Sequence, residues 1–241
     1  MTNKIKRVCE ILSEEGVQSL YKTCSKLIWM KIYRNFASRR DTAVVINIDP
    51  HEITRYTPRP RAIKNRWNDI SLLAPGKWDQ WSTKQFDNTI FYRSLVQRYE
   101  EGTNWEDTIL YNETAREIDR RGVSYSYKYN GYSTRQELKN RLSYIDKIYQ
   151  SISLEGYKTK EKLKNNITNE VELGSPHDSV NEVMIDLSRT GEPLFVNGKH
   201  RLGLAKILNI DRIPALVIFH HSKLDCIDYD VVSKYPIKSS A

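Results

Sequence analysis

The residues best suited to chemistry lie at Asn197–Arg201, where Asn-Gly-Lys-His-Arg separates an apolar run from a helical pattern. Gly198 can adopt the left-handed backbone of a tight turn, and the N–H groups and dipole of a following helix favour an anion. Lys199, His200 and Arg201 stand at that helix start, where cations are unfavourable unless an anion neutralises them. The pattern predicts a phosphate-binding turn, with Arg201 gripping phosphate and His200 donating a hydrogen bond or transferring a proton. The alternative is a solvated basic turn.

The composition is typical of a globular protein, because 39% of the 241 residues are hydrophobic and 28% are charged. The formal net charge of +8 indicates an anionic partner: nucleic acid, a nucleotide or an anionic membrane surface. Three scattered cysteines favour neither a disulfide framework nor a zinc site, and they predict a reducing compartment. No apolar run is long enough for a transmembrane helix or a signal peptide, so we expect a cytoplasmic location.

Helical and strand patterns dominate different parts of the chain. The expected helices cover 5–36 with a break at Gly16, 83–101, 105–120, 133–155, 160–165 and 202–208, and the expected strands cover 43–48, 183–187, 194–196 and 215–219. This order predicts an α+β fold, in which a largely helical region precedes a small mixed sheet with helices. We expect an N-terminal helical segment at 1–40, a mainly helical region at 41–170 and a core at 171–241.

Residues 17–36 have the pattern of a basic amphipathic helix, because apolar residues recur at helical spacing beside lysines. Trp29 and Tyr33 lie near its end. Such a helix can lie in an anionic membrane interface, which would make the protein peripheral at the inner face of the membrane. The alternative is a helix packed on its own domain with solvated lysines, since any surface helix is amphipathic.

The motif at 197–210, Asn-Gly-Lys-His-Arg-Leu-Gly-Leu-Ala-Lys-Ile-Leu-Asn-Ile, is followed by Ile213-Pro-Ala-Leu-Val. It resembles the signature of the ParB/sulfiredoxin superfamily, whose members hold nucleotide phosphates at this turn. The resemblance implies a ParB/sulfiredoxin-like nucleotide-binding core at 171–241. Gly198, His200 and Arg201 match the signature directly, whereas Asn197 replaces its usual aspartate.

Two departures narrow the functions that the resemblance implies. Sulfiredoxins have a cysteine where this chain has Lys199, so reduction of sulfinic acids is not expected. No helix-turn-helix pattern follows the motif, so DNA is a less favoured partner than a nucleotide. More loosely, the whole chain resembles uncharacterised archaeal and bacterial ParB-like proteins. The matching segments are Gly76–Asp79, Glu101–Thr108, Glu155–Tyr157 and Ser188–Glu192, which places the helices at 84–165 in the same functional unit.

Two further residues are candidates near the turn. In kinases that the signature resembles, an acidic residue on the preceding strand is the catalytic base, and Glu182 is the best-placed match. It could accept a proton from a substrate hydroxyl provided that it faces the turn. Arg189 could reach the phosphate. The alternatives are an exposed strand carboxylate and an arginine solvated in a hairpin.

Aromatic and acidic residues occur together at two places. Trp78 with Asp79, and Trp105 with Asp107, could bind the sugar, the base or the acceptor of a nucleotide reaction and position a metal ion. The alternative is structural: Asp107 complements the dipole of the helix that it begins, and Trp105 packs beneath it.

These patterns favour a protein that binds an ATP-type nucleotide with Mg²⁺ and transfers phosphate to a small hydroxylated acceptor. Its site would combine Asn197–Arg201 and Arg189 for the nucleotide with Glu182 and His200 for the chemistry. One alternative is a regulatory, DNA-associated or purely nucleotide-binding ParB-like module. A second alternative is a nuclease, but no carboxylate cluster for its metal ions is visible.

Overall fold

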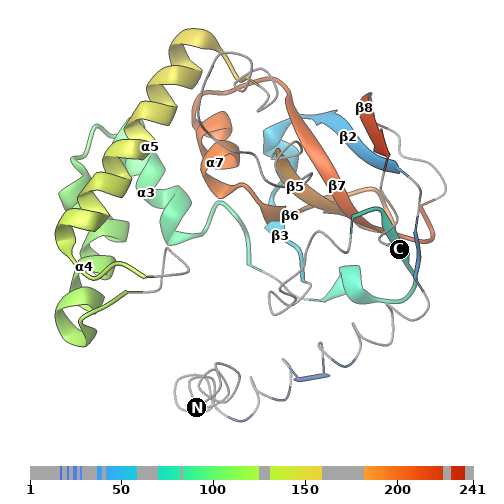
Figure 1. The fold of residues 1–241 in the computed structure, drawn as a ribbon, viewed down its shortest axis with the longest axis horizontal. Helices are drawn as coiled ribbons and strands as arrows, with labels where there is room; N and C mark the ends of the chain where they lie inside the picture. The colour runs from blue at the N-terminus through green and yellow to red at the C-terminus, as the bar shows by residue number, and fades with distance from the viewer. Residues whose placement is uncertain are drawn as a thin grey trace.

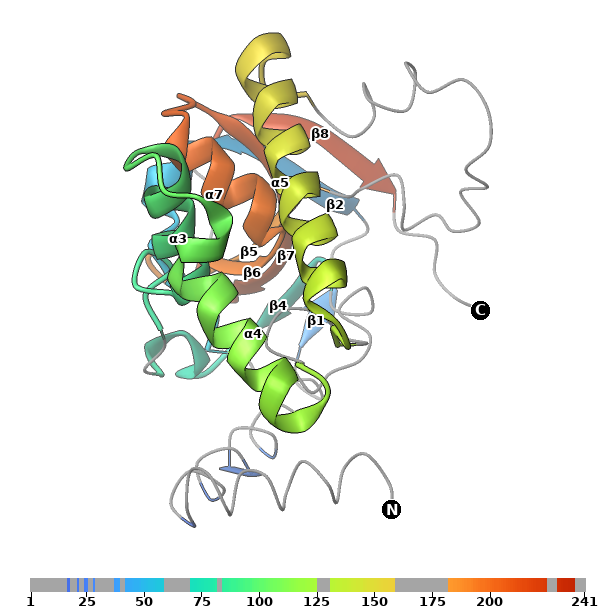
Figure 2. The same ribbon diagram turned by 90° about the vertical axis from the view of Figure 1, so that its left-hand side faces the viewer.

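The structure is a computed structural model that describes residues 37–39, 42–58, 70–81, 84–124, 131–158, 182–224 and 229–236, and five helical residues between 17 and 28. Eight strands form one mixed sheet. Four helices gather on one side of it (Figures 1 and 2): α3 (Ile90–Tyr99), α4 (Ile109–Arg121), α5 (Arg135–Glu155) and α7 (Lys199–Ile207). A mixed sheet with helices agrees with the α+β class in general.

The strand β7 (Ile213–His221) is the centre of the sheet. Along one side it pairs with the parallel strand β5 (Val183–Leu187). Along the other it pairs with the antiparallel strand β2 (Thr42–Ile48) over its first half and with the parallel strand β4 (Leu72–Ala74) at its end. Three parallel strands, β4, β5 and β7, therefore end at the same edge of the sheet.

The remaining strands extend the sheet outward. Beyond β5 lie the antiparallel strand β6 (Pro193–Asn197) and then β3 (Arg55–Tyr56), parallel to β6. The strand β1 (Ser38–Arg39) pairs with β4, and β8 (Val231–Pro236) pairs with β2. The sheet thus combines a strand from 1–40 and strands from 41–170 with strands from 171–241.

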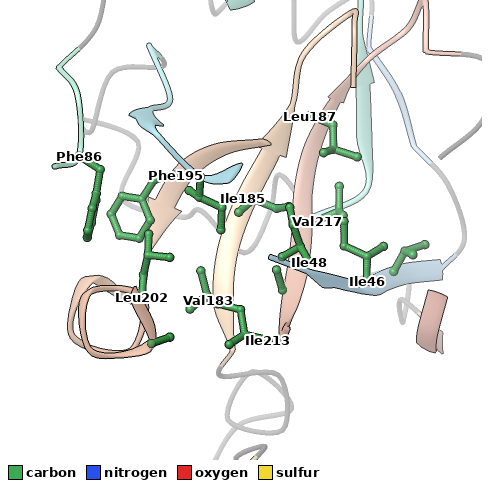
Figure 3. Close-up of a cluster of buried hydrophobic side chains, with 14 residues drawn as sticks. Ile46, Ile48, Phe86, Val183, Ile185, Leu187, Phe195, Leu202, Ile213 and Val217 are labelled. Atoms are coloured by element: carbon green, nitrogen blue, oxygen red, sulfur yellow. The ribbon is translucent and has the colours of Figure 1, made fainter. Parts of the chain in front are cut away.

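Both faces of the central strands are buried. Side chains alternate between the faces, so Val44, Ile46 and Ile48 join a cluster with Leu202 of α7 (Figure 3), while Val45 packs on the opposite face. This arrangement explains why 43–48, 183–187 and 213–219 are mostly apolar, because strands covered on both faces carry few polar residues.

Helix α7 lies between the sheet and the other helices. Its Leu202 and Ala205 pack toward the sheet, whereas Leu204 and Ile207 join a cluster with α3, α4 and α5. Gly203 permits this close approach, because a Cβ there would lie 2.6 Å from Cδ1 of Leu95 on α3. The packing holds the N-terminal end of α7 in a defined place beside α5.

Helix boundaries differ from the predicted ones where a threonine caps the backbone. Helix α3 begins seven residues later than its predicted start at 83, because the Thr89 hydroxyl accepts a hydrogen bond from the Tyr92 amide. At 105–107 the chain forms the 3-10 turn η4 (Trp105–Asp107), and Thr108 then caps α4. Helix α5 begins after Thr134, within the predicted capping segment. The predicted helix at 160–165 lies outside the described residues.

Candidate functional site

The turn at Asn197–Arg201 has the predicted strand–turn–helix form. Strand β6 ends at Asn197, Gly198 has a left-handed backbone with φ of 92°, and α7 begins at Lys199 without a side-chain cap. A Cβ at Gly198 would also lie 3.1 Å from the Cα of Val183, so close approach to β5 requires glycine here as much as the backbone angle does. The N-cap residue is a glycine, so it provides no side chain to accept from the first amides of α7, and the N-terminal end of a helix favours an anion.

Glu182 lies beside this turn, directly before β5. Its Oε2 is 2.6 Å from Nη1 of Arg201, and both side chains are mostly buried. The sequence interpretation required Glu182 to face the turn, and the structure places it there. Glu182, the proposed base, and Arg201, the proposed phosphate ligand, therefore form an ion pair with each other. Each charge thus compensates the other in a mostly buried place.

The end of α5 forms one wall around Arg201. Nη2 of Arg201 donates a hydrogen bond of 2.7 Å to the carbonyl oxygen of Lys158, and its guanidinium lies 4.7 Å from the ring centre of Tyr157. Burial raises the pKa of the Tyr157 hydroxyl, with a smaller opposing effect from Arg201. The side chain of Arg201 is thus held on three sides, by a carboxylate, a carbonyl and an aromatic ring.

His200 lies on the other side of the helix start, against α3 and α5. Its ring contacts Phe91 edge-on, with the ring centres 5.2 Å apart, and its Nε2 is 3.4 Å from Nη2 of Arg141. Burial, Arg141 and Lys199 together lower the pKa of the imidazole to about 3. His200 is therefore neutral near pH 7 and a weak base. The geometry favours a hydrogen-bonding role for His200 over the predicted proton transfer.

A neutral, buried His200 predicts a specific loss of stability in mild acid. The folded protein binds this proton with a pKa of about 3, below the ordinary 6.5, so the unfolded chain binds more protons and stability falls as pH drops below 6.5. Between pH 7.5 and 5.5 the loss is about 1.4 kcal/mol. Urea unfolding at both pH values should show this loss in the wild type and not in His200→Gln. His51→Gln, at an exposed histidine, is the control, and equal pH dependence of the wild type and His200→Gln would contradict the assignment.

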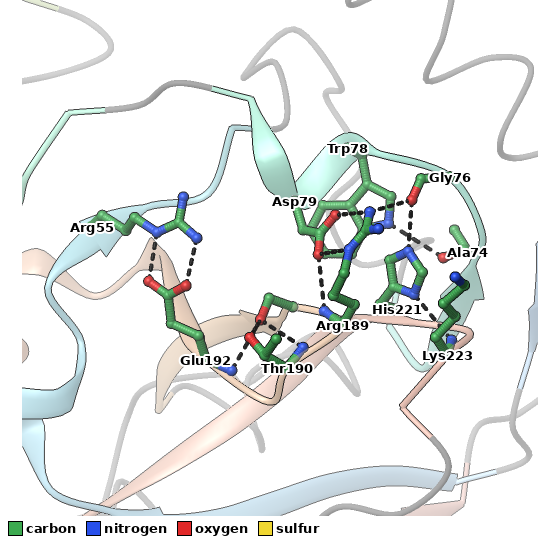
Figure 4. Close-up of polar contacts among 11 residues, drawn as sticks. Arg55, Ala74, Gly76, Trp78, Asp79, Arg189, Thr190, Glu192, His221 and Lys223 are labelled. Carbon is green, nitrogen blue, oxygen red and sulfur yellow. Dashed lines mark hydrogen bonds and ion pairs between the residues drawn. The ribbon is translucent and has the colours of Figure 1, made fainter.

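Arg189 and Asp79 meet at the opposite edge of the sheet (Figure 4). Nε and Nη2 of Arg189 donate to the two carboxylate oxygens of Asp79 over 2.8 and 2.6 Å, and the Arg189 backbone amide donates over 3.0 Å. Nη2 of Arg189 also donates to the carbonyl of Gly76, which accepts a second hydrogen bond from His221. This network joins the segments that follow β4, β5 and β7.

The position of this network separates Arg189 from the phosphate turn. Glu182 precedes β5 and Arg189 follows it, so the five residues of β5 lie between them. At roughly 3.4 Å per residue this is about 17 Å. The structure therefore brings Arg189 and Asp79 together as an ion pair, away from Asn197–Arg201. Neither side chain lies where it could contact a phosphate held at the turn.

The two tryptophans predicted to bind a substrate are core residues. Trp78 is fully buried against Phe219, and its Nε1 donates to the Ala74 carbonyl. Trp105 is buried among the helices, and its Nε1 donates to the carboxylate of Asp146. Asp107 is exposed in η4, before the start of α4. These residues lie in separate clusters and do not form a common site with the turn, in line with the structural alternative for Trp105.

Two residues at the turn were not predicted as part of a site. Arg141 comes from the middle of α5, and nothing in the sequence distinguishes it from other helical arginines. Tyr157 had a signal, because Glu155–Tyr157 is one of the segments that match ParB-like proteins, but it was interpreted only as a helix end. Both are at least 40 residues from the turn in the chain. They reach it because α5 packs beside α7.

Within the described ranges, no group of three histidine, cysteine or carboxylate side chains has the arrangement of a metal site. In the same ranges no helix is long and apolar enough to span a bilayer. Comparison of the chain with protein-family models, with curated proteins and with solved structures gave no match.

Proposed function

We propose that this protein binds the phosphate groups of an ATP-type nucleotide at Asn197–Arg201 and transfers phosphate to a small hydroxylated acceptor. The proposal includes a ParB/sulfiredoxin-like fold for the core, on the resemblance of the motif. One observation carries it: Arg141 and Lys199 lie close enough to His200 at the positive N-terminal end of α7 to add to the effect of burial in lowering its pKa, and Arg201 stands at the same helix end, paired with Glu182. Cations gathered at this end of a helix dipole repel one another and the dipole unless an anion is bound.

A phosphate group suits this arrangement better than a single carboxylate does. It offers several acceptor oxygens to the N-terminal end of α7, where the N-cap residue is a glycine, and its charge compensates more than one cation. The left-handed Gly198 keeps the backbone close to β5 and leaves the approach to the helix end free of a Cβ. Neutral His200 can donate or accept a hydrogen bond there.

Glu182 supports phosphate transfer rather than binding alone. A carboxylate beside the phosphate turn can accept the proton of an attacking hydroxyl once Arg201 is engaged by phosphate. Mg²⁺ would enter with the nucleotide, since this ion is usually held by substrate phosphates, water and one or two carboxylates. Glu182 is the carboxylate closest to the turn that could take part in such coordination.

The test is the binding of ATP, CTP and GTP with Mg²⁺ to the wild type and to Lys199→Gln. Removing a cation from a helix N-terminus should stabilise the fold by a few tenths of a kcal/mol while weakening nucleotide binding about fivefold to tenfold. Lys147→Gln removes the same charge from an exposed position on α5 and should leave the binding constant unchanged. Titration calorimetry gives the affinity, and thermal melting gives the stability. The proposal fails if no nucleotide binds, or if both variants bind equally well.

A further inference from the structure

Four of the five described residues near the N-terminus form an exposed apolar stripe. All five are helical, and Val17, Tyr21 and Ile28 are 73%, 75% and 59% exposed. Cys24 is also exposed. The spacing 17, 21, 24 and 28 places these four side chains on one face of a helix with about 3.6 residues per turn. Ser25 is the partly buried residue of the five.

This stripe differs from the other exposed apolar residues of the described chain. Ile90, Tyr144, Leu154 and Val231 are scattered over α3, α5 and β8, and single exposed apolar side chains are normal on protein surfaces. A row of exposed apolar side chains along one face of a helix is not normal on a protein surface. The sequence left open whether this helix packs on its own domain or faces an interface, and the four described apolar residues of this row are exposed.

The charge around the stripe indicates what covers it. Residues 17–36 contain Lys22, Lys26, Lys31 and Arg34 and no acidic residue. Nucleic acid would account for the cations but leaves the apolar row in water. An anionic bilayer surface accounts for both the cations and the apolar row, because the apolar side chains enter the acyl boundary while the cations meet the headgroups.

We propose that the N-terminal helix docks this protein on an anionic membrane surface, with Val17, Tyr21, Cys24 and Ile28 buried in the interface. The helix lies in the plane of the membrane and does not span it. Binding at this surface is independent of the nucleotide site, so Lys199→Gln is expected to bind membranes as the wild type does.

Sedimentation of the full chain with vesicles tests the proposal. Vesicles of phosphatidylcholine with phosphatidylglycerol should bind more protein than phosphatidylcholine alone, by about fivefold for each cation near the surface. The double variant Tyr21→Ser/Ile28→Ser should weaken binding at least roughly tenfold, because two apolar side chains no longer enter the interface. Leu154→Ser makes the same kind of change at a residue that is 85% exposed on α5, and it should bind like the wild type.

A fluorescent probe provides an independent readout. A polarity-sensitive dye on Cys24, in a Cys9→Ser/Cys226→Ser background, should shift its emission to the blue on anionic vesicles. Three results would overturn the proposal: no vesicle binding by the wild type, equal binding by Tyr21→Ser/Ile28→Ser, or a concentration-dependent dimer that this variant abolishes without vesicles. The last result would mean that a second copy of the chain covers the stripe.

Discussion

Replacing Asp79 with asparagine is expected to lower the free energy of unfolding by about 3–5 kcal/mol. Asp79 is almost fully buried and accepts three hydrogen bonds from Arg189, one from its backbone and two from its guanidinium. The neutral amide would leave the positive charge of Arg189 without its partner in a partly buried place. Removing one member of such a pair is costly because the desolvation of the other is no longer compensated.

The same ion pair predicts the direction of the pH dependence. Burial alone would raise the pKa of Asp79, but the hydrogen bonds and charge of Arg189 lower it below its ordinary value of 3.8. The folded protein thus releases this proton more readily than the unfolded chain does. The stabilisation is present above about pH 4 and is lost as pH falls through the lowered pKa. In Asp79→Asn this acid-dependent loss should be absent.

Urea unfolding of Asp79→Asn measures both effects, with Asp119→Asn as the control. Asp119 also pairs with an arginine, Arg135, but the pair is exposed and should contribute little. Nucleotide affinity of Asp79→Asn should match that of the wild type under conditions where the variant is folded, since β5 separates the pair from the turn. Wild-type stability together with impaired nucleotide binding would instead support the substrate-binding role first considered for Asp79.

Arg201→Ala is expected to cost about 3–5 kcal/mol of stability in addition to nucleotide binding, because it leaves the buried carboxylate of Glu182 without its partner. Loss of nucleotide binding in this variant alone would not distinguish a missing phosphate ligand from a disturbed fold. The double variant Arg201→Ala/Glu182→Gln removes the uncompensated charge. The free energy of unfolding of this double variant should be only about 1–3 kcal/mol below that of the wild type, and the variant should still fail to bind nucleotide.

Glu182→Gln alone separates binding from transfer. Without the carboxylate, Arg201 keeps the Lys158 carbonyl and presents an uncompensated charge to an incoming phosphate. Affinity for ATP should therefore rise, whereas phosphate transfer should fall by about 10²–10⁴ if Glu182 is the general base. Denaturant unfolding, titration calorimetry and a transfer assay on the four proteins complete the cycle. A lower affinity in Glu182→Gln would mean that the carboxylate holds Arg201 in its binding position.

Local features of the chain were readable from the sequence because they depend on near neighbours. The strand predicted at 43–48 is β2, since alternation and continuous apolar runs reflect burial along one strand. Helix α5 begins close to its predicted start at 133, because its cap Thr134 is a near neighbour in the chain. Gly198 marks the turn because of its own backbone freedom. The strand–turn–helix at Asn197–Arg201 is confirmed as a structure, while its nucleotide remains a prediction.

The composition of the site was decided by the tertiary structure. Arg189 and Glu182 flank β5, but the strand carries them to opposite edges of the sheet, so one meets Asp79 and the other meets Arg201. Arg141 and Tyr157 join the turn because α5 packs on α7. Such contacts depend on the order and direction of strands and on helix packing, which follow from the burial of distant residues together. Sequence alone therefore determined where an anion could be held, and the tertiary structure decided which charges surround it.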